Sequence, residues 1–180
     1  MQKLQFLKSG LFLLILFCIS CEKVQPAVGE YWGDIKATKN GKNWEKYLFT
    51  GMYMDNSTLF SLLFLRVDKL GQNREIIDID RLPFKVATYN FKKEDYSNNT
   101  TFFSYGTLVS DGDVPGNSYE LFESSNNIPN RLEITKIDTI TKEIWGKFSA
   151  NLVVTKRGEN VSPDTVILTD GVFHAKLLKK

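Results

Sequence analysis

The chain contains one histidine, and this residue is the first candidate for acid–base chemistry. A serine hydrolase needs a nucleophile beside a histidine base, with an acid that positions the base. No Gly-x-Ser-x-Gly segment marks such a nucleophile. His174 stands between Phe173 and Ala175, and if these apolar neighbours point into a core, His174 points outward. We therefore interpret His174 as a surface residue of a strand and predict no catalytic residue.

Acidic side chains gather in two places where they could act on a ligand. The segment richest in oxygen ligands contains Asp111, Asp113, Asn117 and Glu120. Calcium prefers such ligands, but this segment lacks the regular spacing and closing glutamate of a helix–loop–helix site, and turn formation alone explains its composition. Asp78 and Asp80 could pair with another carboxylate in glycoside hydrolysis, although alternating acids are typical of a solvated strand. We predict no metal and no cofactor.

Aromatic residues outside the clear core pattern could form a binding patch. The candidates are Tyr31, Trp32, Tyr96, Tyr105 and Trp145. Rings that converge on an exposed surface suit stacking on sugar rings or an apolar ligand. If both faces of the sheet are covered, the same rings belong to the core, and the pattern favours this second interpretation. The ligand-binding residues stay unknown at this point.

The first 20 residues predict export. Lys3 and Lys8 give a basic start, residues 11–17 are an unbroken apolar run, and the small residue Ser20 directly precedes Cys21. This order is that of a secretory signal peptide. The apolar run is shorter than the about 20 residues that a membrane-spanning helix needs. An ordinary signal peptide with a chance cysteine and an uncleaved anchor are the two alternatives.

The segment Ile19-Ser20-Cys21, after a leucine-rich run, resembles the lipobox of bacterial lipoproteins, with Cys18 where that motif has Leu, Val or Ile. The resemblance implies a diacylglycerol on the Cys21 sulfur, cleavage just before Cys21 and acylation, as with palmitate, of the new amino terminus. Residues 1–20 are then a signal peptide, residues 21–30 the lipidated cysteine and a tether, and residues 31–180 a single domain.

Cleavage before Cys21 also changes the composition of the mature protein. Removal of 20 of the 180 residues leaves 160, a usual length for one domain. The chain has 23 Lys and Arg and 21 Asp and Glu, and the loss of Lys3 and Lys8 leaves 21 of each sign. This balance gives no support to nucleic-acid binding. Because Cys18 leaves with the leader and Cys21 carries lipid, no disulfide forms within one mature chain.

Short alternating segments between turn residues predict an all-β domain. Asn40-Gly41 predicts a hairpin between residues 34–39 and a strand that returns through Trp44, Tyr47, Phe49 and Tyr53. Residues 58–68 are apolar on both faces, which is typical of a strand in the middle of a structure. Residues 143–155 alternate over six pairs, with Phe148 on one face and Asn151 on the other.

Other segments follow the same pattern. Further strands are expected over residues 75–80, 84–91, 101–110, 119–122, 130–138, 164–168 and 172–178, with turns at 111–117 and 169–171. The chain is therefore predicted to form an antiparallel β-sandwich or a partly open β-barrel of about ten strands, preceded by a helical signal segment.

Four short motifs in the mature chain resemble those of uncharacterised lipoproteins of Bacteroidota-type bacteria. They are Asn40-Gly41-Lys42-Asn43-Trp44, Asn130-Arg131-Leu132-Glu133-Ile134-Thr135 with Asp138, Gly146-Lys147-Phe148, and Asp170-Gly171-Val172-Phe173. The resemblance implies an all-β domain on the outer membrane or cell surface, without an assigned activity. Asp138-Thr139-Ile140 and Asp164-Thr165-Val166 resemble the O-glycosylation acceptor of exported proteins of such bacteria.

These observations favour a lipid-anchored exported protein that binds or scaffolds at the cell envelope and is not an enzyme. Its partners would be the membrane, through the lipid on Cys21, and a glycan or small apolar ligand. The outer membrane is the expected location, with its periplasmic and surface faces both open. A lipocalin-like carrier or a glycan-binding accessory lipoprotein is the alternative. An open interior lined by Phe60, Leu62 and Phe64 favours the carrier, and a filled core favours the scaffold. A hydrolase needs two carboxylates facing a cleft, roughly 5–10 Å apart.

Overall fold

The structure is a computed structural model that describes residues 33–44, 48–54, 58–69, 71–92, 102–109, 114–123, 127–158 and 163–177. The predicted signal peptide, Cys21 and the tether lie outside these residues. All regular secondary structure in the described part is β-strand, which confirms the all-β prediction. Among the described residues, no helix is found that is long and apolar enough to cross a membrane.

The strands follow one another along the chain without intervening helices in the described segments. They are β1 (Gly33–Lys39), β2 (Lys42–Asn43), β3 (Leu48–Met54), β4 (Leu59–Val67), β5 (Asn73–Pro83), β6 (Ala87–Asn90), β7 (Phe102–Val109), β8 (Val114–Leu121), β9 (Arg131–Asp138), β10 (Glu143–Lys156) and β11 (Thr165–Leu177). Paired strands are antiparallel, except for a two-residue parallel contact between β3 and β11.

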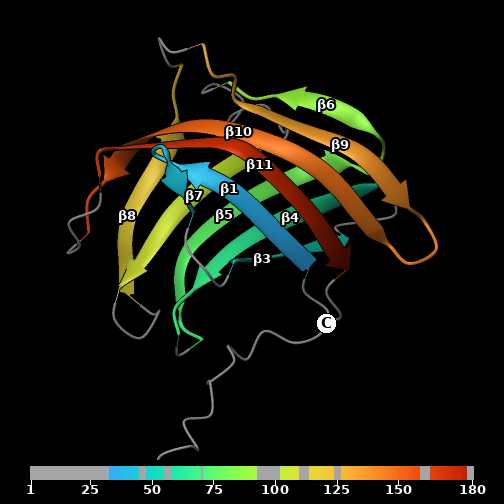
Figure 1. The fold of residues 1–180 in the computed structure, drawn as a ribbon, viewed down its shortest axis with the longest axis horizontal. Coiled ribbons are helices and arrows are strands. Elements are labelled where there is room, and N and C mark those ends of the chain that lie inside the picture. Colours follow the sequence, from blue (N-terminus) through green and yellow to red (C-terminus); the bar gives the residue numbers. More distant parts are fainter. Residues whose placement is uncertain are drawn as a thin grey trace, which may run out of the picture.

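The pairings run in a closed circuit, β1–β3–β4–β5–β7–β8–β10–β11 and back to β1. The first half of β10 pairs with β9, and only its second half pairs with β8. β6 continues the sheet beyond β9. The result is a partly open barrel, in which β9, β10, β11 and β1 form one wall and β3, β4, β5, β7 and β8 the other (Figure 1).

The interior between the two walls is filled by side chains. The ring of Phe64 on β4 lies 4.7 Å from that of Phe148 on β10 and 5.3 Å from that of Phe173 on β11, between centroids. Other fully buried side chains include Phe60, Leu62, Ile77, Ile79, Leu132, Ile134, Ile144, Leu152 and Leu168. Side chains from both walls therefore meet in the interior of the described part of the chain.

The predicted hairpin at Asn40-Gly41 is confirmed. Both residues have positive φ, 49° and 74°, as a tight two-residue hairpin turn requires, and Lys39 pairs with Lys42. The returning strand β2 is only two residues long. The chain then continues into β3, which pairs with β4 over seven positions and with β1 at only two.

A buried carboxylate lies near this hairpin. Glu75 shares the inward orientation of Ile77 on β5, and its side chain is 7% exposed. Its Oε2 lies 2.6 Å from Nζ of Lys39 and accepts a hydrogen bond from Nε1 of Trp44, and its Oε1 lies 2.6 Å from Nε of Arg66. Two cations and an indole therefore compensate this one buried charge and join β1, β4 and β5.

The turn predicted at residues 169–171 is wrong. These residues lie inside β11, which runs unbroken from Thr165 to Leu177. The register with β10 shifts between Phe148 and Ala150, so that two residues of β11 lie opposite Ser149. This mismatch is a β-bulge, in which Asp170 has a positive φ of 53°. A Cβ at Gly171 would collide with the ring of Phe148, so this glycine is required by packing.

Asn151 lies on the face of β10 opposite Phe148, as the alternation predicts, but it is 0% exposed, which the alternation does not predict. The irregular segment before β9 runs beside this part of β10. The Asn151 side-chain amide donates to the carbonyl of Ile128 at 2.7 Å, and its backbone N–H donates to Oδ1 of Asn130 at 2.7 Å. The Asn130 amide in turn donates to the carbonyl of Phe122. These hydrogen bonds hold the segment against the strand.

Smaller differences concern strand boundaries. β8 begins at Val114, within the predicted turn over residues 111–117. β5 continues through to Pro83, and β6 resumes only at Ala87, after an exposed Val86. In β4 Phe60, Leu62 and Phe64 are buried. On the other predicted face Leu65 and Val67 are also buried, whereas Leu59 and Leu63 are half-buried, so that face is fully covered only toward the end of the strand.

The turn between β9 and β10 is held by a carboxylate. Oδ1 of Asp138 accepts backbone hydrogen bonds from Thr141 at 3.0 Å and Ile140 at 2.8 Å, and these bonds hold the pKa of Asp138 below its usual value. Because the folded pKa is depressed, this stabilisation is present above the unfolded pKa and is lost as pH falls through the folded pKa. The turn fixes the two strands that carry much of the face described next.

Candidate binding face

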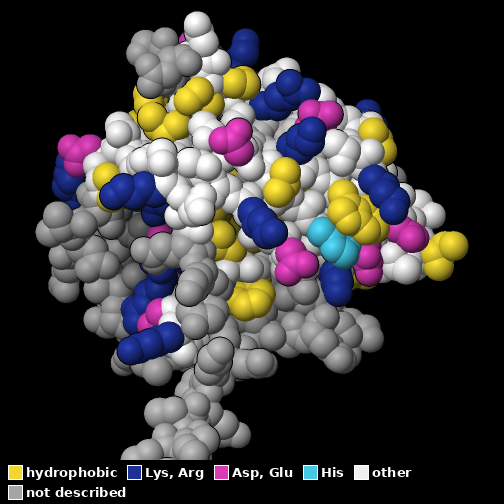
Figure 2. All heavy atoms as spheres, viewed as in Figure 1, with side chains coloured by type: hydrophobic (Ala, Val, Ile, Leu, Met, Phe, Trp, Pro, Cys, Tyr) yellow, Lys and Arg dark blue, Asp and Glu magenta, His cyan; other side chains and the backbone are white. Residues whose placement is uncertain are grey.

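The outward surface of β9, β10, β11 and β1 carries polar side chains in rows across the sheet. Residues that lie opposite one another on neighbouring strands share a face and are close in space. The first row contains Arg131 and Ser149, with Asp170 at the bulge beside them; the second contains Glu133, Lys147, Val172 and Lys36; the third contains Lys136, Trp145, His174 and Asp34. We call this surface the binding face. Figure 2 shows basic and acidic side chains interspersed around the cyan histidine on it.

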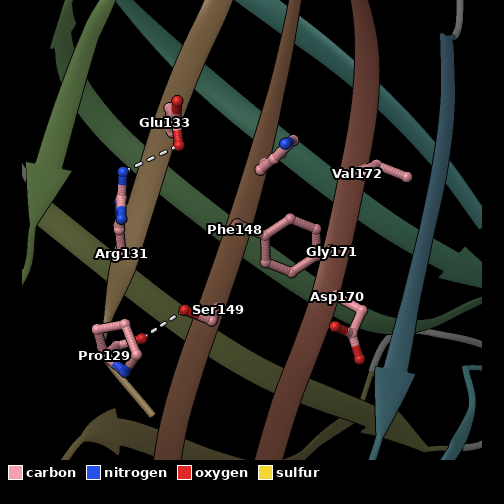
Figure 3. Close-up of a pocket in the computed structure, with 9 residues that line it drawn as sticks. Pro129, Arg131, Glu133, Phe148, Ser149, Asp170, Gly171 and Val172 are labelled. Atoms are coloured by element: carbon pink, nitrogen blue, oxygen red, sulfur yellow. Dashed lines mark hydrogen bonds and ion pairs between the residues drawn. The ribbon is translucent and has the colours of Figure 1, made fainter.

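A hollow of about 420 Å³ lies across the first two rows. Its lining residues come from three neighbouring strands and the segment before them: Pro129, Arg131, Glu133, Lys147, Phe148, Ser149, Asp170, Gly171 and Val172. Figure 3 shows the Arg131–Glu133 ion pair, with 3.0 Å between Nη2 and Oε2, and the Ser149 hydroxyl that donates to the carbonyl of Pro129. The volume falls in the range of ordinary small-ligand sites.

A second hollow of about 260 Å³ adjoins the first. Its lining residues come from the second and third rows and from the core beneath them: Asp34, Ile35, Lys36, Trp145, Val172, Phe173 and His174. Val172 lines both hollows, and this apolar residue is 43% exposed. The two hollows therefore lie side by side with Val172 between them, and we call the pair the groove.

Trp145 and His174 are stacked in the third row. Their ring centroids lie 4.5 Å apart with 8° between the planes, and Nζ of Lys136 lies 4.1 Å from the Trp145 ring centroid. Nε2 of His174 lies 2.7 Å from Oε2 of Glu143. Because His174 and Lys136 belong to strands on opposite sides of β10, they cover different faces of the indole. Trp145 therefore offers a ligand its edge rather than an open face.

The structure places His174 on the outward face, as the alternation predicts. Trp145 is the one aromatic candidate whose side chain is described there. Tyr31, Trp32 and Tyr96 lie outside the described residues, and for Tyr105 the structure describes only the backbone, in β7. Thr139, in the turn after β9, and Thr165, at the start of β11, are both exposed.

The described part of the chain does not bring together a calcium site from the residues considered for one. Asn117 is buried in β8, and its Oδ1 accepts a hydrogen bond from the backbone of Gly158 at 2.9 Å. Glu120 is half-buried on the same strand, and Asp111 and Asp113 lie outside the described residues. Among the residues described, no group of three or more His, Cys, Asp or Glu could hold a metal ion.

The acids that share a hollow are not the predicted ones. Asp78 and Asp80 are half-buried on β5, in the opposite wall. Glu133 and Asp170 instead line the larger hollow, where Glu133 pairs with Arg131 and Asp170 accepts a hydrogen bond from the hydroxyl of Thr169 at 3.1 Å. Sequence reasoning missed both. Glu133 alternates with the core residues Leu132 and Ile134, which could have placed it outward. Asp170 is spaced like the core residues Val166 and Leu168, and only the bulge turns it outward.

Comparison of the chain with known protein families, with curated proteins and with solved structures found no match in any of the three.

Proposed function

We propose that this protein is a lipid-anchored exported protein that binds a ligand at the cell envelope through the binding face, without catalysing a reaction. The observation that carries the proposal is the pair of adjacent hollows, of about 420 and 260 Å³, that share Val172 as a lining residue. Lys36, Lys147, Asp34 and Asp170 stand around it and supply charged and hydrogen-bonding groups. Such a combination of an apolar centre with a few polar groups is typical of ligand sites.

The packing of the interior supports a surface site over a carrier. A lipocalin-like carrier needs an empty interior, whereas Phe60, Leu62 and Phe64 are 0% exposed and Phe64 contacts rings from the opposite wall. The groove, by contrast, opens on the outside of the wall and needs no rearrangement of the core. The ligand would therefore be met at a surface rather than enclosed.

The lipid anchor is tested by metabolic labelling with a palmitate analogue. Because one acyl chain holds a protein only marginally and two or more hold it stably, we expect the wild type to carry label and to stay in the membrane fraction. The Cys21→Ser variant is expected to carry none and to appear in the soluble fraction. Label on the variant at the wild-type level would contradict the anchor and leave the groove to be tested separately.

The binding role is tested by titrating the mature chain, held in detergent micelles, against a panel of glycans and lipids. We expect saturable binding to one chemical class, and a Val172→Asp substitution at the centre of the groove should weaken it at least about tenfold, since an uncompensated charge replaces an apolar contact. Val86→Asp is the control, because Val86 is also an exposed valine, 61% against 43% for Val172, but precedes β6 and lines neither hollow. Binding that is insensitive to Val172→Asp would refute the proposed face.

A further inference from the structure

We infer that the binding face takes an anionic glycan, a sugar chain with carboxylate or sulfate groups, held between Lys36 and Lys147 on either side of Val172. This inference rests on the proposed function and names the ligand class for the same groove. It follows from which charged groups of the face are already paired and which are not.

The two lysines are the cations of the second row that are left for a ligand. Both are exposed, and the register places each directly opposite Val172, Lys36 on β1 and Lys147 on β10. Among the described residues neither has an ion pair, whereas Arg131 is paired with Glu133. β1 and β10 are the two neighbours of β11, so the Cα atoms of Lys36 and Lys147 lie roughly 9–10 Å apart, twice the spacing between neighbouring strands. The ligand should therefore carry two anionic groups about this far apart.

Acids at the two ends of the groove limit the kind of anion that fits. Asp34 lines the smaller hollow and Asp170 the larger one, and their oxygens can accept hydrogen bonds from hydroxyl groups. A continuous negative surface, such as an anionic bilayer, would be repelled by both. A sugar chain can direct its hydroxyls to the acids and its separate charged groups to the lysines.

The backbone of this wall argues against a peptide as the ligand. Extended peptides are usually bound by addition to an exposed strand edge, where main-chain groups are unpaired. β10 and β11 are interior strands, with β9 and β8 on one side of β10 and β1 on the far side of β11. The groove therefore offers no free strand edge to a peptide, which suits a ligand that carries its own donors and charges.

The coverage of Trp145 predicts how the glycan is held. His174 stacks on the indole and the ammonium of Lys136 lies over the ring, so ring-on-ring stacking with a sugar would have to displace one of them. Recognition should then depend mainly on charge and hydrogen bonds. Interactions between exposed charges are screened by salt, so affinity should fall as ionic strength rises.

The test compares hexagalacturonate with its methyl ester, the same sugar chain with its carboxylates neutralised, on the mature chain in detergent micelles. We expect the acid to bind and the ester to bind at least about tenfold more weakly. Lys36→Gln and Lys147→Gln should each weaken the acid about two- to fivefold, and the double variant about tenfold or more. Lys156→Gln is the matched control, because Lys156 is exposed on β10 about 30 Å along the strand from Lys147.

Each alternative outcome has a distinct meaning. Equal binding of acid and ester that still depends on Val172 would overturn this inference and leave the proposed function standing. Equal weakening by Lys156→Gln would overturn it by showing only general charge attraction. Binding to phosphatidylglycerol vesicles or to an acidic peptide, with no binding of hexagalacturonate, would also overturn it. If no member of the wider panel binds through Val172, both the inference and the proposed function fail.

Discussion

Replacing Phe64 with alanine is expected to lower the free energy of unfolding by about 3–5 kcal/mol. The ring is fully buried and lies 4.7 Å from Phe148 and 5.3 Å from Phe173, so its removal leaves a cavity between the two walls of the barrel. A single domain is stable by only about 5–15 kcal/mol, so this loss is a large part of the total. Chemical denaturation monitored by circular dichroism measures it directly.

Phe49→Ala is the matched control for this prediction. Phe49 lies on β3 and is only half-buried, outside the core cluster, so its truncation should cost less than half as much. Equal losses for the two variants, or a loss below about 1 kcal/mol for Phe64→Ala, would mean that the interior is not packed around this ring. That result would favour the lipocalin-like carrier over the surface-binding protein.

Replacing Glu75 with alanine is expected to cost about 2–3 kcal/mol of stability. The substitution leaves Lys39 and Arg66 near one another without the carboxylate that lies 2.6 Å from each, and removes the acceptor of the Trp44 indole. The effect stays below the 3–5 kcal/mol of a fully buried pair because the two cations are about 20% exposed, so that water screens part of their charge.

Thermal and chemical unfolding of Glu75→Ala should be compared with those of Glu133→Ala. Glu133 also pairs with an arginine, Arg131, but on the surface, where such a pair contributes about 0–1 kcal/mol. If the two variants lose the same small amount, the cluster around Glu75 does not stabilise the junction of β1, β4 and β5. If the NMR amide signals of the hairpin around Asn40 are lost in Glu75→Ala but not in Glu133→Ala, the destabilisation is located at this hairpin.

Local patterns were sufficient for the class of fold. The alternation in residues 143–155 predicted β10 with Ile144, Phe148 and Leu152 on one face, and all three are buried. The same patterns failed where one local composition serves two structures. Asp170-Gly171 is typical of a turn and also of a bulge, and only the packing of Gly171 against Phe148 decides between them. Asn151 is buried because a distant segment covers it, which strand alternation cannot predict.

The site was predicted less well than the fold, and for a related reason. Alternation placed His174 outward and Trp145 opposite Phe148. It gave no sign that Lys36 and Lys147 flank Val172, because this depends on the order β1–β11–β10 in the sheet. The burial of Glu75 could have been predicted from strand alternation. Glu75, Ile77 and Ile79 occupy every second position of β5, so all three side chains point to the same, core-facing side.

The binding face can be tested most directly through His174, because the chain contains only one histidine. In untagged protein, the Cε1–Hε1 correlation of its imidazole ring is a single NMR signal from the wall of the smaller hollow, beside Trp145. Titration with hexagalacturonate, or with whichever glycan the panel retains, should move this signal saturably, with the same Kd as binding measured by calorimetry. A ligand that saturates the protein while the His174 signal stays unchanged would show that binding occurs elsewhere.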